Sequence, residues 1–108
     1  MSPITTHILD TALGKPAAGI SVILYSGETE IGRGETNSDG RVTDLLPEGD
    51  MNPGTYRIRF EVAEYLAKSS TAAFYPFVDI TFEVTEGEAH YHVPLLLSPF
   101  GYSTYRGS

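Results

Sequence analysis

The sequence predicts an all-β protein, a two-sheet β-sandwich of about seven or eight strands with one short α-helix. Apolar and polar residues alternate with a period of two in several segments, and clusters of Gly, Asn, Asp and Pro separate them. A single stretch has helical spacing. The 108 residues are enough for one core of this kind, so we expect one domain over residues 1–108.

The first half of the chain contains four of the expected strands, at residues 4–9, 20–25, 31–36 and 41–45. A turn at residues 13–16 (Leu-Gly-Lys-Pro) should end the first of them. Residues 26–28 (Ser-Gly-Glu) fit a tight hairpin. Residues 37–40 (Asn-Ser-Asp-Gly) fit another, because Asp and Gly tolerate the positive φ that such turns require.

The second half begins with a long loop at residues 47–54 and then has the clearest alternation of the chain, at residues 55–62. Residues 77–84 repeat that pattern, followed by an expected strand at 89–97 and a short last one at 102–105. Between them, Val62, Tyr65 and Leu66 have the spacing of one helix face, and Glu64 and Lys68 can pair. This predicts a helix of one to two turns that needs packing to be stable.

Composition excludes several classes of function. With 7 Lys and Arg against 14 Asp and Glu, the net charge is −7, which is unsuited to nucleic acid or to anionic membranes. The absence of cysteine rules out disulfides and thiol chemistry. The apolar runs are far shorter than the ~20 residues of a membrane span, and the N-terminal residues do not read as a signal peptide. We therefore expect a cytoplasmic protein, or a periplasmic or peroxisomal one if a leader has been removed.

The three histidines lie on strand faces that should point away from the core. In the expected strand at 89–97, His90 and His92 alternate with apolar residues and share a face with Pro94 and Leu96. His7 has the same relation to the first strand. From the pattern alone, these histidines could be solvated surface residues or part of a binding site.

Three sequence blocks carry a family resemblance. They are T-H-I-L-D-T-A-L-G-K-P-A at residues 6–17, T-N-S-D-G-R at 36–41, and H-Y-H-V-P-L-L-L-S-P-F-G-Y-S-T-Y-R-G-S at 90–108. In this order and over the whole chain, they resemble the transthyretin-related 5-hydroxyisourate hydrolases.

The resemblance implies a fold, an activity and an assembly. The fold would be the transthyretin-like sandwich. The activity would be hydrolysis of 5-hydroxyisourate to 2-oxo-4-hydroxy-4-carboxy-5-ureidoimidazoline in urate catabolism, by attack of water on a ring amide and without a metal or other cofactor. The assembly would be a homotetramer, a dimer of dimers with its sites at the interface.

The same resemblance assigns site residues. The matched positions imply a catalytic set, which is spread over the chain, and a substrate-binding set, which lies at its end. Arg41 offers a planar donor fork to carbonyl oxygens, and a neutral histidine can accept a proton from water. Ser108 would orient water or a substrate heteroatom, Tyr105 would anchor the last segment, and Gly107 would allow close backbone approach. The catalytic set is His7, Arg41, His92 and Ser108, and the binding set is Tyr105, Arg106 and Gly107.

Three other readings remain open at this point. His90, His92 and His7 could form a three-histidine zinc site, although the motif is weak. A serine nucleophile is less favoured, since the chain has no G-x-S-x-G elbow. A transthyretin-like carrier of a small ligand would have the same fold, so the site residues must distinguish it from a hydrolase. The sequence does not fix which histidine acts as the base, although the resemblance gives His92 more weight than His90.

Overall fold

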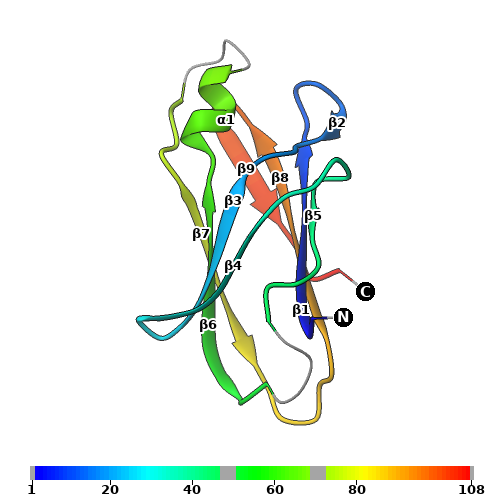
Figure 1. The fold of residues 1–108 in the computed structure, drawn as a ribbon, viewed down its shortest axis with the longest axis vertical. Coiled ribbons are helices and arrows are strands. Elements are labelled where there is room, and N and C mark those ends of the chain that lie inside the picture. The colour runs from blue at the N-terminus through cyan, green and yellow to red at the C-terminus, as the bar shows by residue number, and fades with distance from the viewer. Residues whose placement is uncertain (1, 47–50, 69–72, 108) are drawn as a thin grey trace.

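The computed structural model of the chain describes residues 2–46, 51–68 and 73–107. These residues form nine strands and one helix, arranged as the all-β sandwich that the sequence predicts. Figure 1 shows the two sheets as layers, with the helix at one end of the sandwich. In chain order the elements are β1 (Ile4–Asp10), β2 (Lys15–Pro16), β3 (Ser21–Ser26), β4 (Thr29–Glu35), β5 (Arg41–Val42), β6 (Gly54–Glu61), α1 (Ala63–Lys68), β7 (Val78–Val84), β8 (Tyr91–Ser98) and β9 (Gly101–Thr104).

The strands divide into a five-stranded and a four-stranded sheet. The five-stranded sheet has the order β2-β1-β8-β9, and the short β5 also pairs with β1. The four-stranded sheet has the order β4-β3-β6-β7 and is antiparallel throughout. Within the described residues, β7 and β9 are therefore edge strands of the two sheets.

The core lies between the sheets and follows the predicted alternation. On β6, Ile58 and Phe60 are fully buried, whereas Arg57 and Arg59, which alternate with them, are only half-buried. On β8, Leu95 and Leu97 are buried and Leu96 is not. Each such apolar side chain contributes about 1.5–3 kcal/mol when fully buried. This burial fixes which face of each strand points inward, and with it which residues point out.

The pairing of β1 with β8 is parallel and continuous. It runs from Ile4 opposite Tyr91 to Asp10 opposite Leu97 without a register shift. The Thr6 hydroxyl adds a bond of 2.6 Å to the Val93 carbonyl. Since β1 and β8 come from opposite ends of the sequence, this ladder brings the two termini of the domain together (Figure 1).

The end of β1 is held by the side chain of Asp10. Its Oδ1 accepts bonds of 3.0 Å from the backbone N–H groups of Ala12 and Leu13. Its Oδ2 accepts a bond of 2.7 Å from the Tyr65 hydroxyl on α1. Burial and this bond together raise the pKa of Tyr65 to about 12. One carboxylate thus closes the turn after β1 and ties the helix to the five-stranded sheet.

Two of the predicted turns differ from the expectation, one in its own structure and the other in the strands that it connects. The predicted turn at residues 13–16 contains a strand, because Lys15 and Pro16 pair with Asp10 and Leu9 as β2. The predicted turn at residues 37–40 closes tightly, with Gly40 at φ 74°, but it does not make a hairpin. It connects β4 in the four-stranded sheet to β5, which pairs with β1 in the other.

Several strand limits also differ from the prediction. β5 covers only Arg41 and Val42, although a strand over residues 41–45 was expected. β8 begins at Tyr91, two positions after the expected start, and the last strand ends at Thr104. Residues 47–50 of the expected long loop lie outside the described residues.

The predicted helix is present as α1, which buries Leu66. Lys68 and Glu64 pair at 3.8 Å, and both are well exposed, so their ion pair contributes little stability. No helix in the described part of the chain is long and apolar enough to cross a membrane.

Candidate active site

A hollow of about 420 Å³ opens on the outer face of the five-stranded sheet. It contains five of the seven residues that the sequence analysis assigned to the site. Arg106 does not line it, and Ser108 lies outside the described residues. The lining residues are Thr5, Thr6, His7, Arg41, Thr43, His90, His92, Tyr105 and Gly107.

Strand register brings the polar groups of the hollow together. β1 is flanked on one side by β5, where His7 is directly opposite Arg41. On its other side it is flanked by β8, where Thr5 is opposite His92. Directly opposite residues have side chains on the same face of a sheet. Three neighbouring strands therefore place His7, Arg41 and His92 on one surface, half-buried or exposed, while Ile4 and Ile8 fill the core behind it.

The turn before Arg41 sets the position of its strand. Asn37 Oδ1 accepts bonds of 2.9 Å from the Asp39 N–H and 3.0 Å from the Arg41 N–H. The Gly40 carbonyl accepts a bond of 2.7 Å from the Ile8 N–H. A Cβ at Gly40 would lie 2.5 Å from the Ile8 carbonyl oxygen, and φ there is +74°. Glycine is therefore required for the turn to approach β1 and deliver Arg41 opposite His7.

The end of the chain closes one side of the hollow. The Gly107 N–H donates a 2.8 Å bond to the His92 carbonyl, which forms a bridge between this residue and β8. A Cβ at Gly107 would lie 2.5 Å from Cδ2 of the His92 ring. The backbone thus passes directly against the imidazole, as the sequence analysis expected for a glycine in this position.

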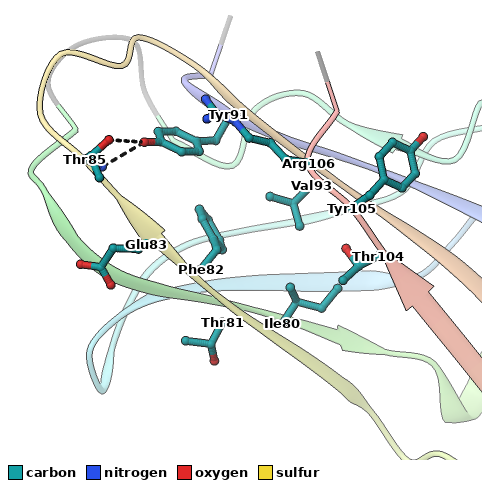
Figure 2. Close-up of a pocket in the computed structure, with 10 residues that line it drawn as sticks. All are labelled: Ile80, Thr81, Phe82, Glu83, Thr85, Tyr91, Val93, Thr104, Tyr105 and Arg106. Carbon is teal, nitrogen blue, oxygen red and sulfur yellow. Dashed lines mark hydrogen bonds between the residues drawn. The ribbon is translucent and has the colours of Figure 1, made fainter.

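The side chains of Tyr105 and Arg106 point to opposite sides of this last segment, as Figure 2 shows. Arg106 lies over the Tyr91 ring at 4.3 Å and donates bonds to Glu88 Oε1 at 3.2 Å and to the His90 carbonyl at 3.3 Å. It lines a second hollow of about 340 Å³, where the Tyr91 hydroxyl accepts a bond from the Thr85 N–H. Arg106 thus fastens the segment outside the histidine hollow.

Tyr105 does not anchor the segment as expected. It lines both hollows, but it is 56% exposed, so its ring is not packed within a single chain. The anchoring that was assigned to Tyr105 is instead made by the Arg106 side chain and by the Gly107 backbone.

Burial and Arg41 favour neutral histidines in the hollow. Desolvation by burial lowers the pKa of His7, and the Arg41 guanidinium lowers it further, against a backbone hydrogen bond and the charge of Asp39. Desolvation also comes first in lowering the pKa of His92, followed by Arg41, His7 and His90, while a backbone hydrogen bond with Thr5 acts in the opposite direction. Neutral imidazole can accept a proton, so both rings are suited to act as bases near pH 7.

The three-histidine zinc site is not formed. Among residues 2–46, 51–68 and 73–107, no group of three His, Asp or Glu side chains is arranged to hold a metal ion. Two of the three histidines, His90 and His92, instead lie within hydrogen-bond distance of one hydroxyl, that of Thr5. Thr5 Oγ1 lies 2.8 Å from His92 Nδ1 and 3.2 Å from His90 Nε2.

Sequence reasoning did not single out Thr5 or Thr43 as site residues, and it considered His90 only as a ligand of the alternative zinc site. The alternation on the first strand already placed Thr5 on the face of His7, which was the available signal. Its contacts with His90 and His92 could not be foreseen, because they depend on the register between β1 and the segment that leads into β8.

The pKa values of His7 and His92 provide a first test. We expect both rings to titrate below the ordinary value of 6.5 in the folded protein, and at that value in denaturant. NMR titration of the ring Cε1–H signals, assigned with single His→Gln variants, measures this. Arg41→Gln should raise both values because it removes a neighbouring cation, whereas Arg33→Gln on exposed β4 is a matched control. Folded-state values at or above 6.5 would contradict the described electrostatics.

The contact between Gly107 and His92 provides a second test. We expect Gly107→Ala to displace either the His92 ring or the last segment, because the added Cβ has no room beside Cδ2. The His92 ring signals should therefore shift, with little change in melting temperature since no core side chain is involved. Gly101→Ala is the matched control, because its Cβ would meet only Ser98 Oγ at 3.5 Å. Unchanged His92 signals in Gly107→Ala would refute the close approach.

Comparison with known proteins identifies the family. Residues 4–107 match the HIUase/Transthyretin family. The 5-hydroxyisourate hydrolase of Salmonella dublin is 43% identical over 97% of this chain and 80% of its own length. That of Mus musculus is 43% identical over 99% of this chain and 96% of its own. The 5-hydroxyisourate hydrolase 2 of Rhizobium meliloti is 47% identical, over 97% and 95%.

Solved structures show the same relationship. The 5-hydroxyisourate hydrolase of Klebsiella pneumoniae superposes with a TM-score of 0.89 at 34% identity, and the superposition covers 100% of both chains. Sea bream transthyretin in complex with thyroxine superposes with a TM-score of 0.91 at 29% identity, covering 98% of this chain and 95% of the other. From both the sequence and the fold, the chain belongs to the HIUase/Transthyretin family.

Proposed function

We propose that the protein hydrolyses 5-hydroxyisourate to 2-oxo-4-hydroxy-4-carboxy-5-ureidoimidazoline, a step in urate catabolism. The observation that carries this proposal is the hollow in which two histidines with lowered pKa values lie beside Arg41. The hydrolase names of relatives that are 43–47% identical over nearly the whole chain support it.

The arrangement suits hydrolysis of a cyclic amide. Arg41 presents a planar donor fork that can bind a carbonyl oxygen and stabilise the negative charge that develops on it. A neutral histidine accepts a proton from water as the water oxygen bonds to the carbonyl carbon. The ring C–N bond then breaks, and the same proton passes to the leaving nitrogen. One water is consumed, and the products are an N–H group and a carboxylic acid, which releases its proton to give the carboxylate; no cofactor takes part.

A carrier function needs a separate argument, because the fold is shared. This chain superposes on a thyroxine-bound transthyretin about as well as on a hydrolase. Binding a small ligand does not by itself require a proton acceptor, whereas activation of water requires a base that is unprotonated near neutral pH, as neutral histidine is. The composition of the hollow therefore favours the hydrolase over the carrier.

The activity can be measured with substrate that urate oxidase generates in the cuvette. We expect the protein to accelerate the ultraviolet decay of 5-hydroxyisourate above its spontaneous rate. His7→Ala, Arg41→Ala and His92→Ala should each lower turnover by about 10²–10⁴-fold, as removal of an acid–base or charge-stabilising group does. His90→Ala should cost less than His92→Ala. Arg33→Ala, at an exposed residue that pairs with Glu30, is the folded control. Decay no faster than the spontaneous reaction would overturn the hydrolase function.

We further propose that the active form is a homotetramer, a dimer of dimers with the hollow at an interface. Tyr105 is 56% exposed at the mouth of the hollow, next to an outer face that also carries half-buried Leu96. The edge strands β7 and β9 have backbone groups that no other described strand pairs, and such edges need a partner or protection.

Sedimentation equilibrium at the protein concentration of the assay tests this assembly. We expect the mass of a tetramer, and dilution into the dissociated state should reduce the specific activity because the hollow then loses its outer wall. A monomer that remains fully active on dilution would refute an interface site.

A further inference from the structure

The Thr5 hydroxyl lies between two imidazole rings of the hollow. Its Oγ1 is 2.8 Å from His92 Nδ1 and 3.2 Å from His90 Nε2. Thr5 is only 7% exposed, and the parallel pairing of β1 with β8 sets it directly opposite His92. We propose that Thr5 is a positioning residue whose hydroxyl couples the two histidines and keeps the proton of neutral His92 on Nδ1. The proposal rests on the hydrolase function proposed above.

Counting hydrogens shows why the two rings are coupled. A hydroxyl has one hydrogen to donate, and a neutral imidazole has one N–H donor and one acceptor nitrogen. If Thr5 donates to His90 Nε2, its oxygen accepts from His92, so Nδ1 of His92 must carry the proton. If Thr5 donates to His92 Nδ1 instead, the proton of His92 must be on Nε2. The described residues give Thr5 Oγ1 no third partner to which its hydrogen could turn.

The first of these arrangements is the one that catalysis can use. With Nδ1 protonated, His92 Nε2 has a free lone pair and can take a proton from water. After that transfer both nitrogens of His92 carry hydrogen, and Nδ1–H still donates to Thr5 without any rearrangement. In the opposite arrangement Nε2 already carries a proton and cannot accept another. The chain from His92 Nδ1–H through the Thr5 hydroxyl to His90 Nε2 thus fits both the base and its conjugate acid.

The other groups around His92 cannot replace Thr5 in this role. Arg41 on β5 has only donors, and it acts on His92 through its charge. His7 on β1 likewise acts on His92 through charge. Gly107 contacts the ring at Cδ2 and bonds to the His92 backbone. The Thr5 backbone also acts on the ring and raises the pKa of His92. Among the described residues, the Thr5 hydroxyl is the side-chain group within hydrogen-bond distance of a ring nitrogen of His92.

The tautomer can be observed directly, without substrate. Histidine labelled with ¹⁵N, in the unmodified protein at a pH where His92 is neutral, gives two-bond ¹⁵N–¹H correlations that identify the protonated nitrogen. We expect the proton on Nδ1 of His92. A proton on Nε2 would overturn the proposal whether or not the protein is active. If the unmodified protein does not accelerate the decay of 5-hydroxyisourate, that result would instead overturn the hydrolase function on which the proposal rests.

Substitution of the hydroxyl supplies the second measurement. Thr5→Val keeps the shape of the side chain but removes the donor and acceptor, so His92 should shift toward the Nε2–H form. We expect kcat to fall roughly 10- to 100-fold, as when a group that orients a reacting imidazole is lost, with KM little changed. Thr5→Ser should restore both the Nδ1–H form and most of kcat.

The control and the contrary outcomes complete the test. Thr55→Val removes an exposed hydroxyl of the other sheet, which donates to Glu83 Oε1, and should leave kcat unchanged. A Thr5→Val protein with the tautomer and kcat of the unmodified protein would overturn the proposal. So would a Thr5→Ser protein with activity no better than that of Thr5→Val.

Discussion

The parallel pairing of β1 with β8 is the constraint on which the site depends. Seven consecutive residue pairs join them, from Ile4 with Tyr91 to Asp10 with Leu97. A slip of one residue is strongly disfavoured, because the buried apolar side chains of the strand that moved would then turn to the solvent face. The hydrophobic core thereby fixes Thr5 opposite His92 and places His7, two residues further along β1, on the same face. The positions of these groups follow from burial on the other side of the sheet.

The last described residues use that sheet as their support. The Gly107 backbone bonds to the His92 carbonyl, and Arg106 is held by the Tyr91 ring, by Glu88 and by the His90 carbonyl. All of these contacts are made to β8 or to the residues just before it. Any displacement of β8 would therefore move the imidazole and the wall of the hollow together. This explains how a short terminal segment with few apolar contacts can have a defined place beside reacting groups.

The sequence was most informative where a local pattern decides the structure. Period-two alternation predicted the outward faces of His7 and His92, and the helical spacing of Val62 and Leu66 predicted α1. It was least informative where distant segments meet. The pairing of β5 with β1, after the chain has crossed from the other sheet, and the role of Arg106 as an anchor depend on contacts between residues far apart in sequence. The assignments of catalytic roles came from the family resemblance and are still predictions.

The same forces that prepare the histidines for catalysis link stability to pH. His7 and His92 have folded-state pKa values below 6.5, because burial and Arg41 disfavour their charged forms. The folded chain then binds fewer protons than the unfolded one as pH falls below 6.5, so protonation favours unfolding. The stability that the neutral rings contribute is complete above pH 6.5 and is lost as pH falls through the lowered values. The charge of Arg41 thus has different consequences near neutral pH and in acid. Near neutral pH its charge helps to keep both rings unprotonated, whereas in acid its charge opposes that of the protonated histidines. A hollow that gathers a cation and two bases on one side of a small sandwich is therefore suited to chemistry at neutral pH, and it should be among the first parts of the fold to loosen in acid.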